Sequence, residues 1–579
     1  MTLLIAALPV ALLIIAMTSP WPRRWLPLPA HVALPGMALL AYILQLAYFR
    51  GGSPDELSSG VLRLVHAGVI DGVLSSLTPL AIVFGAVLLF KTMELSGAMR
   101  VVTGRLQSLR DDRVAHLVLV GWAFAFLIEG LSGFGTPAAL AAPILVGLGF
   151  PPVRVAAMCL VMNSVPVSFG AVGTPVWFGL GEIGLTSDEV RTVAVKAAWV
   201  NALAALVIPV LALRIVVPWR EIRSRAGFIA LVTLATVVPY VLAAWWSVEF
   251  PSIIGGICGV LVGVAAARWG IGLPHAGGEG GEPRKAGMSR VTATGELSLA
   301  RAIIPLVAVV AILGVTRIGQ VGVKGVLTSE AGAIALPLGV LGEFWVSPAL
   351  VVGLRDILGA GVSWRMPVLY VPFVLPFVVV SLAAAPLLRM PRDAVRRAWS
   401  DTFRRLTRPA IALAGALVLV KMLMLGGETA PAMHIGHGLA AASGGMWPAF
   451  APLLGALGSF FSGSNTVSNL TFAPAQAALA DTLALDRTTI LALQTVGGAM
   501  GNMVCVHNIV SVGAVLGLRE RTPRRPAASA TDEHDARSGG AAEGASGGVG
   551  AVLRLTAGPM LAYAVVAGVC GVAMIGFGL

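Results

Sequence analysis

Charged residues are scarce in this chain. Only 12% of its 579 residues are Asp, Glu, Lys or Arg, whereas 57% are hydrophobic and the mean hydropathy is +0.87. A soluble chain carries charge on roughly a quarter of its residues. The shortage excludes an ordinary soluble domain and predicts that lipid surrounds most of the chain.

Cysteines and catalytic motifs are scarce as well. Cys159, Cys258, Cys505 and Cys570 lie singly in apolar runs, without the paired spacing of a zinc or redox site. There is no HExxH motif, no GxSxG motif with triad partners and no paired aspartate motif. We therefore expect no metal, no cofactor and no enzymatic activity. A membrane-embedded enzyme or a non-transporting sensor remains the less favoured alternative, because the polar linkers are too short to hold a signalling domain.

Long apolar runs are what the sequence has in abundance. A helix needs about 20 residues to cross a hydrocarbon core of ~30 Å, and we expect roughly 12 to 14 membrane segments. The predicted fold is an all-α polytopic membrane protein. The clearest runs are Leu3–Met17, Val32–Tyr48, Leu77–Phe90, His116–Ile128, Ala198–Val217, Phe228–Trp246, Ile253–Ala267, Ile303–Val315, Ala331–Leu341, Val368–Leu388, Ile411–Met424 and Leu555–Phe577. No charge precedes the first run, so we interpret it as a retained helix rather than a secretory signal.

The net charge of +12 comes from short loops between these runs. Such clustering follows the positive-inside rule and does not indicate nucleic-acid binding. We expect the basic loops to be cytoplasmic and both chain termini to be external. The clusters are Arg23–Arg24, Arg100–Arg113, Arg220–Arg225, Arg268–Arg301, Arg389–Arg408 and Arg519–Arg525.

Two polar interruptions divide the chain. We predict a first membrane half at 1–268, a cytoplasmic linker at 269–299 and a second membrane half at 300–518. A disordered cytoplasmic linker at 519–550 and a final membrane helix at 551–579 follow. Membrane transporters are commonly built from two related halves.

Each half carries two polar, glycine-rich breaks in apolar sequence. In the first half they are EGLSGFGTPAALAAP from Glu129 and NSVPVSFGAVGTP from Asn163; in the second they are SGSNTVSN from Ser462 and TVGGAMGNMVCVHN from Thr495. The matched order predicts an inverted repeat with broken or re-entrant helices in regions 126–180 and 450–518.

Broken backbone survives at membrane depth only where protein encloses it or where it lines a wet cavity. A new helix N-terminus there offers unpaired N–H groups and a partial positive charge, which suit an anion. The alternative for any single residue is close helix packing. The predicted binding residues are Gly133, Gly135, Thr136, Asn163, Ser164, Ser464, Asn465, Thr466, Asn469 and Asn502.

Ionisable groups at membrane depth are functional candidates. Burial of Glu129 would disfavour its charged form, so that it could carry a proton, and His507 could titrate near neutral pH. Glu129 could instead pair with Arg154 or Lys196, and His507 could be a packed neutral side chain. Arg317 and Lys324 could attract a carboxylate or could lie in an external loop.

The chain resembles the L-lactate permease family of bacterial carboxylate transporters. The resemblance rests on GFGTPAALAAPILVGLGFPP, NSVPVSFGAVGTP, SFFSGSNTVSN and LQTVGGAMGNMVCVHNIVSVGAVLGL. It implies a protein of the bacterial plasma membrane that takes up L-lactate, and also D-lactate or glycolate, by proton symport. The SNT element is similar to the hairpin tip of the dicarboxylate and citrate transporters of the wider ion-transporter superfamily. That likeness implies re-entrant hairpins and an elevator-type homodimer. A sodium-coupled carboxylate or dicarboxylate transporter is the alternative, because exposed carbonyls near Gly463–Thr466 could coordinate a cation. The implied partners are a small monocarboxylate, a proton and the lipid bilayer.

Overall fold

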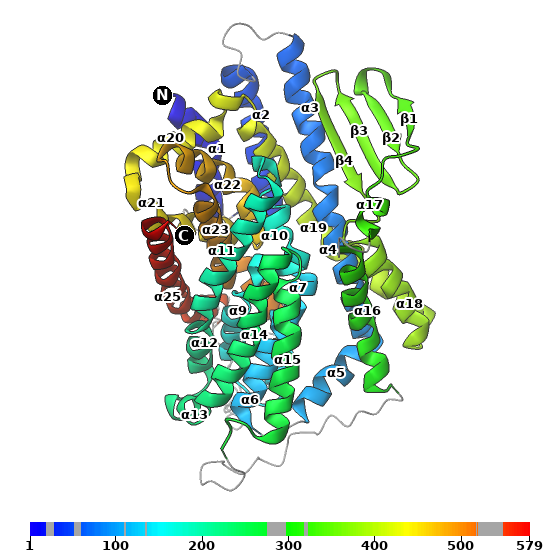
Figure 1. The fold of residues 1–579 in the computed structure, drawn as a ribbon, viewed down its shortest axis with the longest axis vertical. Coiled ribbons are helices and arrows are strands. Elements are labelled where there is room, and N and C mark those ends of the chain that lie inside the picture. Colours follow the sequence, from blue (N-terminus) through cyan, green and yellow to red (C-terminus); the bar gives the residue numbers. More distant parts are fainter. Residues whose placement is uncertain are drawn as a thin grey trace, which may run out of the picture.

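The computed structural model describes residues 1–18, 28–50, 59–108, 112–133, 136–274, 297–317, 322–516, 518 and 548–578. Most of both predicted linkers lies outside these residues, and so does Gly135. Helices make up most of the fold, and one small sheet stands at the end of the molecule away from α5 and α13 (Figure 1).

In the part of the chain that the structure describes, fifteen α-helices precede the first interruption. They are α1 Thr2–Thr18, α2 Ala30–Leu44, α3 Ser59–Ser75, α4 Leu77–Leu95, α5 Ala98–Gln107, α6 Arg113–Val118, α7 Ala125–Ser132, α8 Thr136–Gly147, α9 Pro152–Met162, α10 Gly170–Trp177, α11 Ser187–Ala205, α12 Ile208–Val216, α13 Trp219–Ser224, α14 Ala226–Trp246 and α15 Pro251–Trp269.

After it, the described residues contain ten α-helices, of which the longest are α19 with 33 residues and α25 with 30. They are α16 Leu299–Arg317, α17 Val323–Leu327, α18 Val380–Leu387, α19 Arg392–Met424, α20 Pro431–Ser443, α21 Trp447–Ser462, α22 Asn465–Thr482, α23 Arg487–Gly501, α24 Val506–Val515 and α25 Gly548–Phe577.

Ten helices in the described residues are long and apolar enough to cross a membrane, and one bent pair raises the number to 11. The sequence suggested 12 to 14. The difference arises because apolar runs beside the breaks form short helices, such as Pro137–Gly147, that do not span by themselves.

Four strands form the sheet, a departure from an exclusively helical fold. The expectation of a membrane segment at Ala331–Leu341 is wrong, because this run is too short to span and its residues 334–337 form β1. The antiparallel order is β1 Ile334–Pro337, β2 Glu343–Val346, β3 Val351–Ile357 and β4 Val362–Pro367. The indole of Trp345 on β2 covers Gly353, its register partner on β3.

Small residues bring the helices close together. A Cβ at Gly415 of α19 would lie 2.6 Å from the backbone nitrogen of Pro35 on α2, and one at Gly72 of α3 would lie 2.8 Å from the Cα of Val418 on α19. Helices α2, α3, α4 and α19 thus form one closely packed group. Glycines at such contacts allow the backbone approach on which packing in lipid depends.

The second helical group contains the breaks. Helix α15 packs its glycine face on α7 and α14, and α21 packs on α23 through Gly455, Gly497 and Gly501. The last helix, α25, lies against α9, α21 and α23. Its Tyr563 is fully buried and donates a hydrogen bond of 2.6 Å to Oδ1 of Asn201 on α11.

An ion cluster joins the two groups. The Nζ atom of Lys421 on α19 lies 2.7 Å from Asp71 on α3 and also binds the carboxylate of Glu182, which follows α10. Lys421 and Asp71 belong to the first group, whereas Glu182 belongs to the second. The cluster is therefore a charged contact between the two helical groups.

Replacing Lys421 by Met should lower the free energy of unfolding by about 2–4 kcal/mol, because two largely buried carboxylates would lose their cation. Thermal unfolding of the purified protein measures this. Arg191→Met removes the exposed pair with Asp188 and should cost less than about 1 kcal/mol. Equal shifts in the two variants would contradict a stabilising role for the cluster.

Candidate functional site

The first break of each half begins with a serine that ends a helix and a glycine with positive φ, although the ψ angles of the two glycines differ (−161° and 14°). Helix α7 ends at Ser132 and is followed by Gly133 with φ of 63°; α21 ends at Ser462 and is followed by Gly463 with φ of 70°. Positive φ is easily adopted by glycine alone, which explains its presence after each serine. The chain then starts a new helix, α8 or α22.

The second breaks also correspond. A 3-10 turn, Pro166–Phe169, separates α9 from α10, and a second one, Asn502–Val504, separates α23 from α24. The sequence prediction of two breaks in each half is thus present in the structure, in the same order of helices and turns. Most polar residues at these breaks whose side chains are described are buried inside the protein, among them Asn163, Ser464, Asn465 and Asn502.

Residues from all four breaks line one pocket; the fourth break contributes a residue of its 3-10 turn. Its lining comprises Glu129, Gly133, Val167, Gly170, Ala171, Pro175, Gly463, Ser464, Asn465, Thr466 and Asn502. Six of these were predicted from the sequence: Glu129, Gly133, Ser464, Asn465, Thr466 and Asn502. The cavity of about 20 Å³ has room for roughly one water molecule, so a larger ligand requires the walls to separate.

Glu129 is the ionisable group of the pocket. It is 2% exposed, and its Oε2 accepts a hydrogen bond of 3.0 Å from Nδ2 of Asn163. Neither of the cations considered from the sequence pairs with it in the described part of the chain: Lys196 binds Asp486 at 2.7 Å, and Arg154 has no such contact. The carboxyl lies so close to Gly170 that a Cβ there would be 2.5 Å from Oε1.

The start of α22 forms the opposite wall. Ser464 caps the helix and accepts a hydrogen bond from the backbone N–H of Val467. Asn465 donates to the carbonyl of Thr495 at 3.0 Å, while its Oδ1 atom is buried without a partner among the described residues. The first N–H groups of a helix have no partner within the helix, and here they begin at the pocket.

Two other predicted binding residues have structural roles. Ser164 donates to the carbonyl of Val161, and Asn469 donates to the carbonyl of Pro175 and to Thr495, so these two stabilise the walls of the pocket from behind. Thr136, a predicted binding residue, begins α8, and His507, a predicted proton carrier, lies in α24.

The sequence predicted a break at Asn163–Pro175 but no binding residue between Val167 and Pro175, although four residues of that segment line the pocket. Ala171, Val172 and Gly173 have φ values of 46°, 58° and 71°, a left-handed turn that is rare for a β-branched residue. Thr174 donates to the carbonyl of Ala171, and Trp177 donates to that of Val172 at 3.0 Å. A signal was available, since Gly-Thr-Pro occurs at both 135–137 and 173–175.

Comparison with known proteins gives a consistent family. The family model described as L-lactate permease matches residues 2–523, so α25 lies outside the match. The chain is 43% identical to the putative L-lactate permease of Haemophilus influenzae, over 85% of this chain and 89% of that protein. It is 26% identical to the L-lactate permease of Bacillus subtilis, over 86% of this chain and 93% of that protein. The solved structure of MtrF from Neisseria gonorrhoeae, described among antimetabolite efflux pumps, aligns with a TM-score of 0.46 and 13% identity. The alignment covers 98% of this chain and 97% of MtrF.

Gly498→Ala should destabilise the protein, because the added Cβ would overlap Oδ1 of Asn465. In a helix the same change ordinarily stabilises by roughly 0.5–1 kcal/mol; here we expect a loss of about 1–3 kcal/mol from overpacking. Thermal unfolding of the variant and of the unmodified protein measures this loss. Gly558→Ala in α25, where nothing lies within 4 Å of the new Cβ, is the matched control. Similar melting temperatures for the two variants would refute the close contact.

Proposed function

The chain belongs to the L-lactate permease family, and on this basis we propose that it is a secondary active transporter that takes up L-lactate by proton symport. We extend the proposal to D-lactate and glycolate, which share the carboxylate and the neighbouring hydroxyl. The observation that carries it is the pocket that joins Glu129 of the first half to the tip Ser464–Thr466 of the second.

The carboxylate of lactate is proposed to bind at the start of α22. The helix dipole and the free N–H groups there stabilise a negative charge without a fixed cation. Among the residues that line the pocket there is no Lys or Arg, so the anion would be held by partial charges and hydroxyls. Binding of this kind suits a carrier, which must also release its substrate.

Glu129 is proposed to carry the coupled proton. Its partner Asn163 suits both protonation states, because an amide offers a donor and an acceptor. Nδ2 now faces the carboxylate, and Oδ1 is buried without a partner in the described residues. Rotation of the amide would let Oδ1 accept a hydrogen bond from the O–H of the protonated Glu129 carboxyl. One proton with one lactate then crosses the membrane without net charge.

Sodium coupling is the second candidate, and one observation favours it. Oδ1 of Asn465 and Oγ of Ser459 are both buried without a hydrogen-bond partner in the described chain, and both lie beside Gly498. Two oxygens without donors can coordinate a hard cation such as Na⁺. A carrier that used this position would require sodium rather than a proton gradient.

Orientation and assembly are part of the same proposal. The arginines of α5 and α13 gather at the end of the molecule opposite the sheet, which supports a cytoplasmic location for that end (Figure 1). The sheet and both termini would then be external. We also propose a homodimer that moves its substrate by an elevator-type motion of the helical group containing the breaks.

Labelled L-lactate supplied to proteoliposomes tests the activity and its coupling. We expect uptake that rises with an inward proton gradient, falls as external pH rises and collapses with a protonophore. A sodium gradient should have no effect at fixed pH. Uptake that needs sodium and ignores the protonophore would establish the second candidate, and preference for a dicarboxylate would overturn the substrate assignment.

Glu129→Gln should abolish proton-driven accumulation but retain exchange of lactate across the membrane, because a neutral amide keeps the shape of the site and cannot release a proton. Efflux of preloaded lactate into buffers with and without lactate separates the two activities. The exposed Glu428→Gln serves as control and should behave like the unmodified protein. Normal accumulation by Glu129→Gln would exclude Glu129 as the proton carrier.

A further inference from the structure

Arg317 is buried although it ends a helix next to the external sheet. It is the last residue of α16, and its side chain is 5% exposed. The alternative of an ordinary external loop residue is therefore wrong for Arg317. Lys324, on α17, is exposed as that alternative expected.

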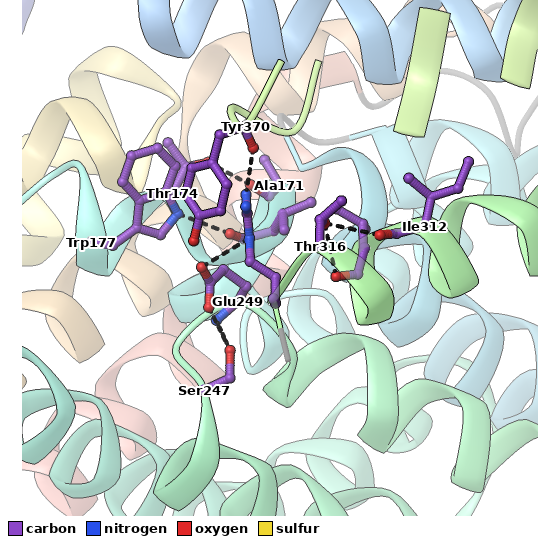
Figure 2. Close-up of polar contacts among 11 residues, drawn as sticks. Ala171, Thr174, Trp177, Ser247, Glu249, Ile312, Thr316 and Tyr370 are labelled. Atoms are coloured by element: carbon purple, nitrogen blue, oxygen red, sulfur yellow. Dashed lines mark hydrogen bonds and ion pairs between the residues drawn. The ribbon is translucent and has the colours of Figure 1, made fainter. Parts of the chain in front are cut away.

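The guanidinium has three contacts. Nε lies 3.2 Å from Oε1 of Glu249, and Nη2 donates to the carbonyl of Tyr370 at 3.0 Å. The guanidinium carbon stacks 3.8 Å from the centre of the Tyr370 ring. Figure 2 shows Glu249 and Tyr370 close together, with Ala171 and Thr174 beside them. The contacts hold the guanidinium plane in one orientation.

One side of the guanidinium is unused. Nη1 is buried and has no hydrogen-bond partner among the described residues, although it carries two N–H donors. Lys324 adds a second cation, with Nζ 5.9 Å from the centre of the same Tyr370 ring. Within the described chain the carboxylate of Glu249 pairs with Arg317, and no carboxylate pairs with Lys324. The cluster therefore has one uncompensated positive charge, which a small anion would neutralise.

The cluster touches the wall of the pocket. Gly173 packs on the backbone of Val248 and Glu249, so closely that a Cβ there would lie 2.9 Å from the Cα of Glu249. Gly173 belongs to the left-handed turn whose first residue, Ala171, lines the pocket. A change in the Arg317–Glu249 pair would thus be transmitted directly to the turn.

We propose that Arg317 is a binding position for the substrate carboxylate on the route from the sheet side to the pocket. This inference rests on the proposed function. The anion approaches past exposed Lys324 and binds Nη1 through charge-assisted hydrogen bonds. It competes with Glu249 for the guanidinium, and the loosened Glu249 frees the Ala171–Gly173 turn. No covalent step is involved.

The test is the concentration dependence of L-lactate uptake in proteoliposomes. Arg317→Gln should raise KM at least about tenfold, the effect of one lost charge-assisted hydrogen bond, while the maximal rate changes less than about threefold. Arg317→Lys should give an intermediate KM, because it keeps the charge without the planar fork. Glu249→Gln should lower KM, because the competing carboxylate is gone.

Arg355→Gln is the matched control. Arg355 also has a carboxylate partner, Glu343 at 3.3 Å, and an aromatic stack, Trp345 at 4.7 Å, but it is 49% exposed on the sheet. Its KM should remain within about twofold of the unmodified protein, as for an exposed ion pair.

The outcomes separate the two proposals. Absence of lactate uptake by the unmodified protein overturns the proposed function. Normal uptake with an unchanged KM in Arg317→Gln, or a lower maximal rate alone, overturns the role of Arg317 and leaves the function intact. If Arg317→Gln does not yield folded protein, Glu249→Gln decides: an unchanged or higher KM overturns the proposal.

Discussion

The structure depends on one constraint: a backbone N–H or C=O group at membrane depth must find a partner inside the protein. Four helix breaks in a chain that is 57% hydrophobic would violate it at every break if they faced lipid. The fold surrounds the breaks with helices and gives them local side-chain partners. Ser462 accepts from the backbone of Ser464 and donates to its carbonyl, while Thr174 and Trp177 satisfy the left-handed turn. The same enclosure creates a polar pocket shielded from lipid.

Glycine serves this arrangement in two different ways. At Gly133 and Gly463 it permits the positive φ that lets one helix end and the next begin. At Gly455, Gly497 and Gly501 it permits α21 and α23 to touch through their backbones. Gly498 has a third role, because the absence of a side chain leaves space for the Asn465 amide. The same glycine-rich stretch therefore contains both close helix contacts and residues that line the pocket.

The sequence predicted the breaks and much of the pocket because small polar residues and glycine are conspicuous in apolar runs. It did not predict the sheet, because β1 lies in an apolar run that is too short for a membrane helix and does not alternate between apolar and polar residues as a half-buried strand does. It missed Val167, Gly170 and Ala171, whose side chains are apolar or absent; their position in the pocket depends on a left-handed turn that contacts Val248 far along the chain. Burial of Arg317 was equally hidden, since it depends on Glu249 and Tyr370, which only the fold brings together.

The hydrogen bond between Tyr563 and Asn201 has a consequence for biosynthesis. The two residues are 362 positions apart, and Asn201 also donates to Ser168, beside the pocket wall, and to Tyr240. Membrane insertion follows the order of synthesis, so Asn201 enters the bilayer long before its partner has been translated. The network behind the first-half break is completed only when α25 is inserted. A chain whose translation ends in the second polar interruption would contain nearly all of its helices but would lack the hydrogen bond from Tyr563 to Asn201 behind the pocket.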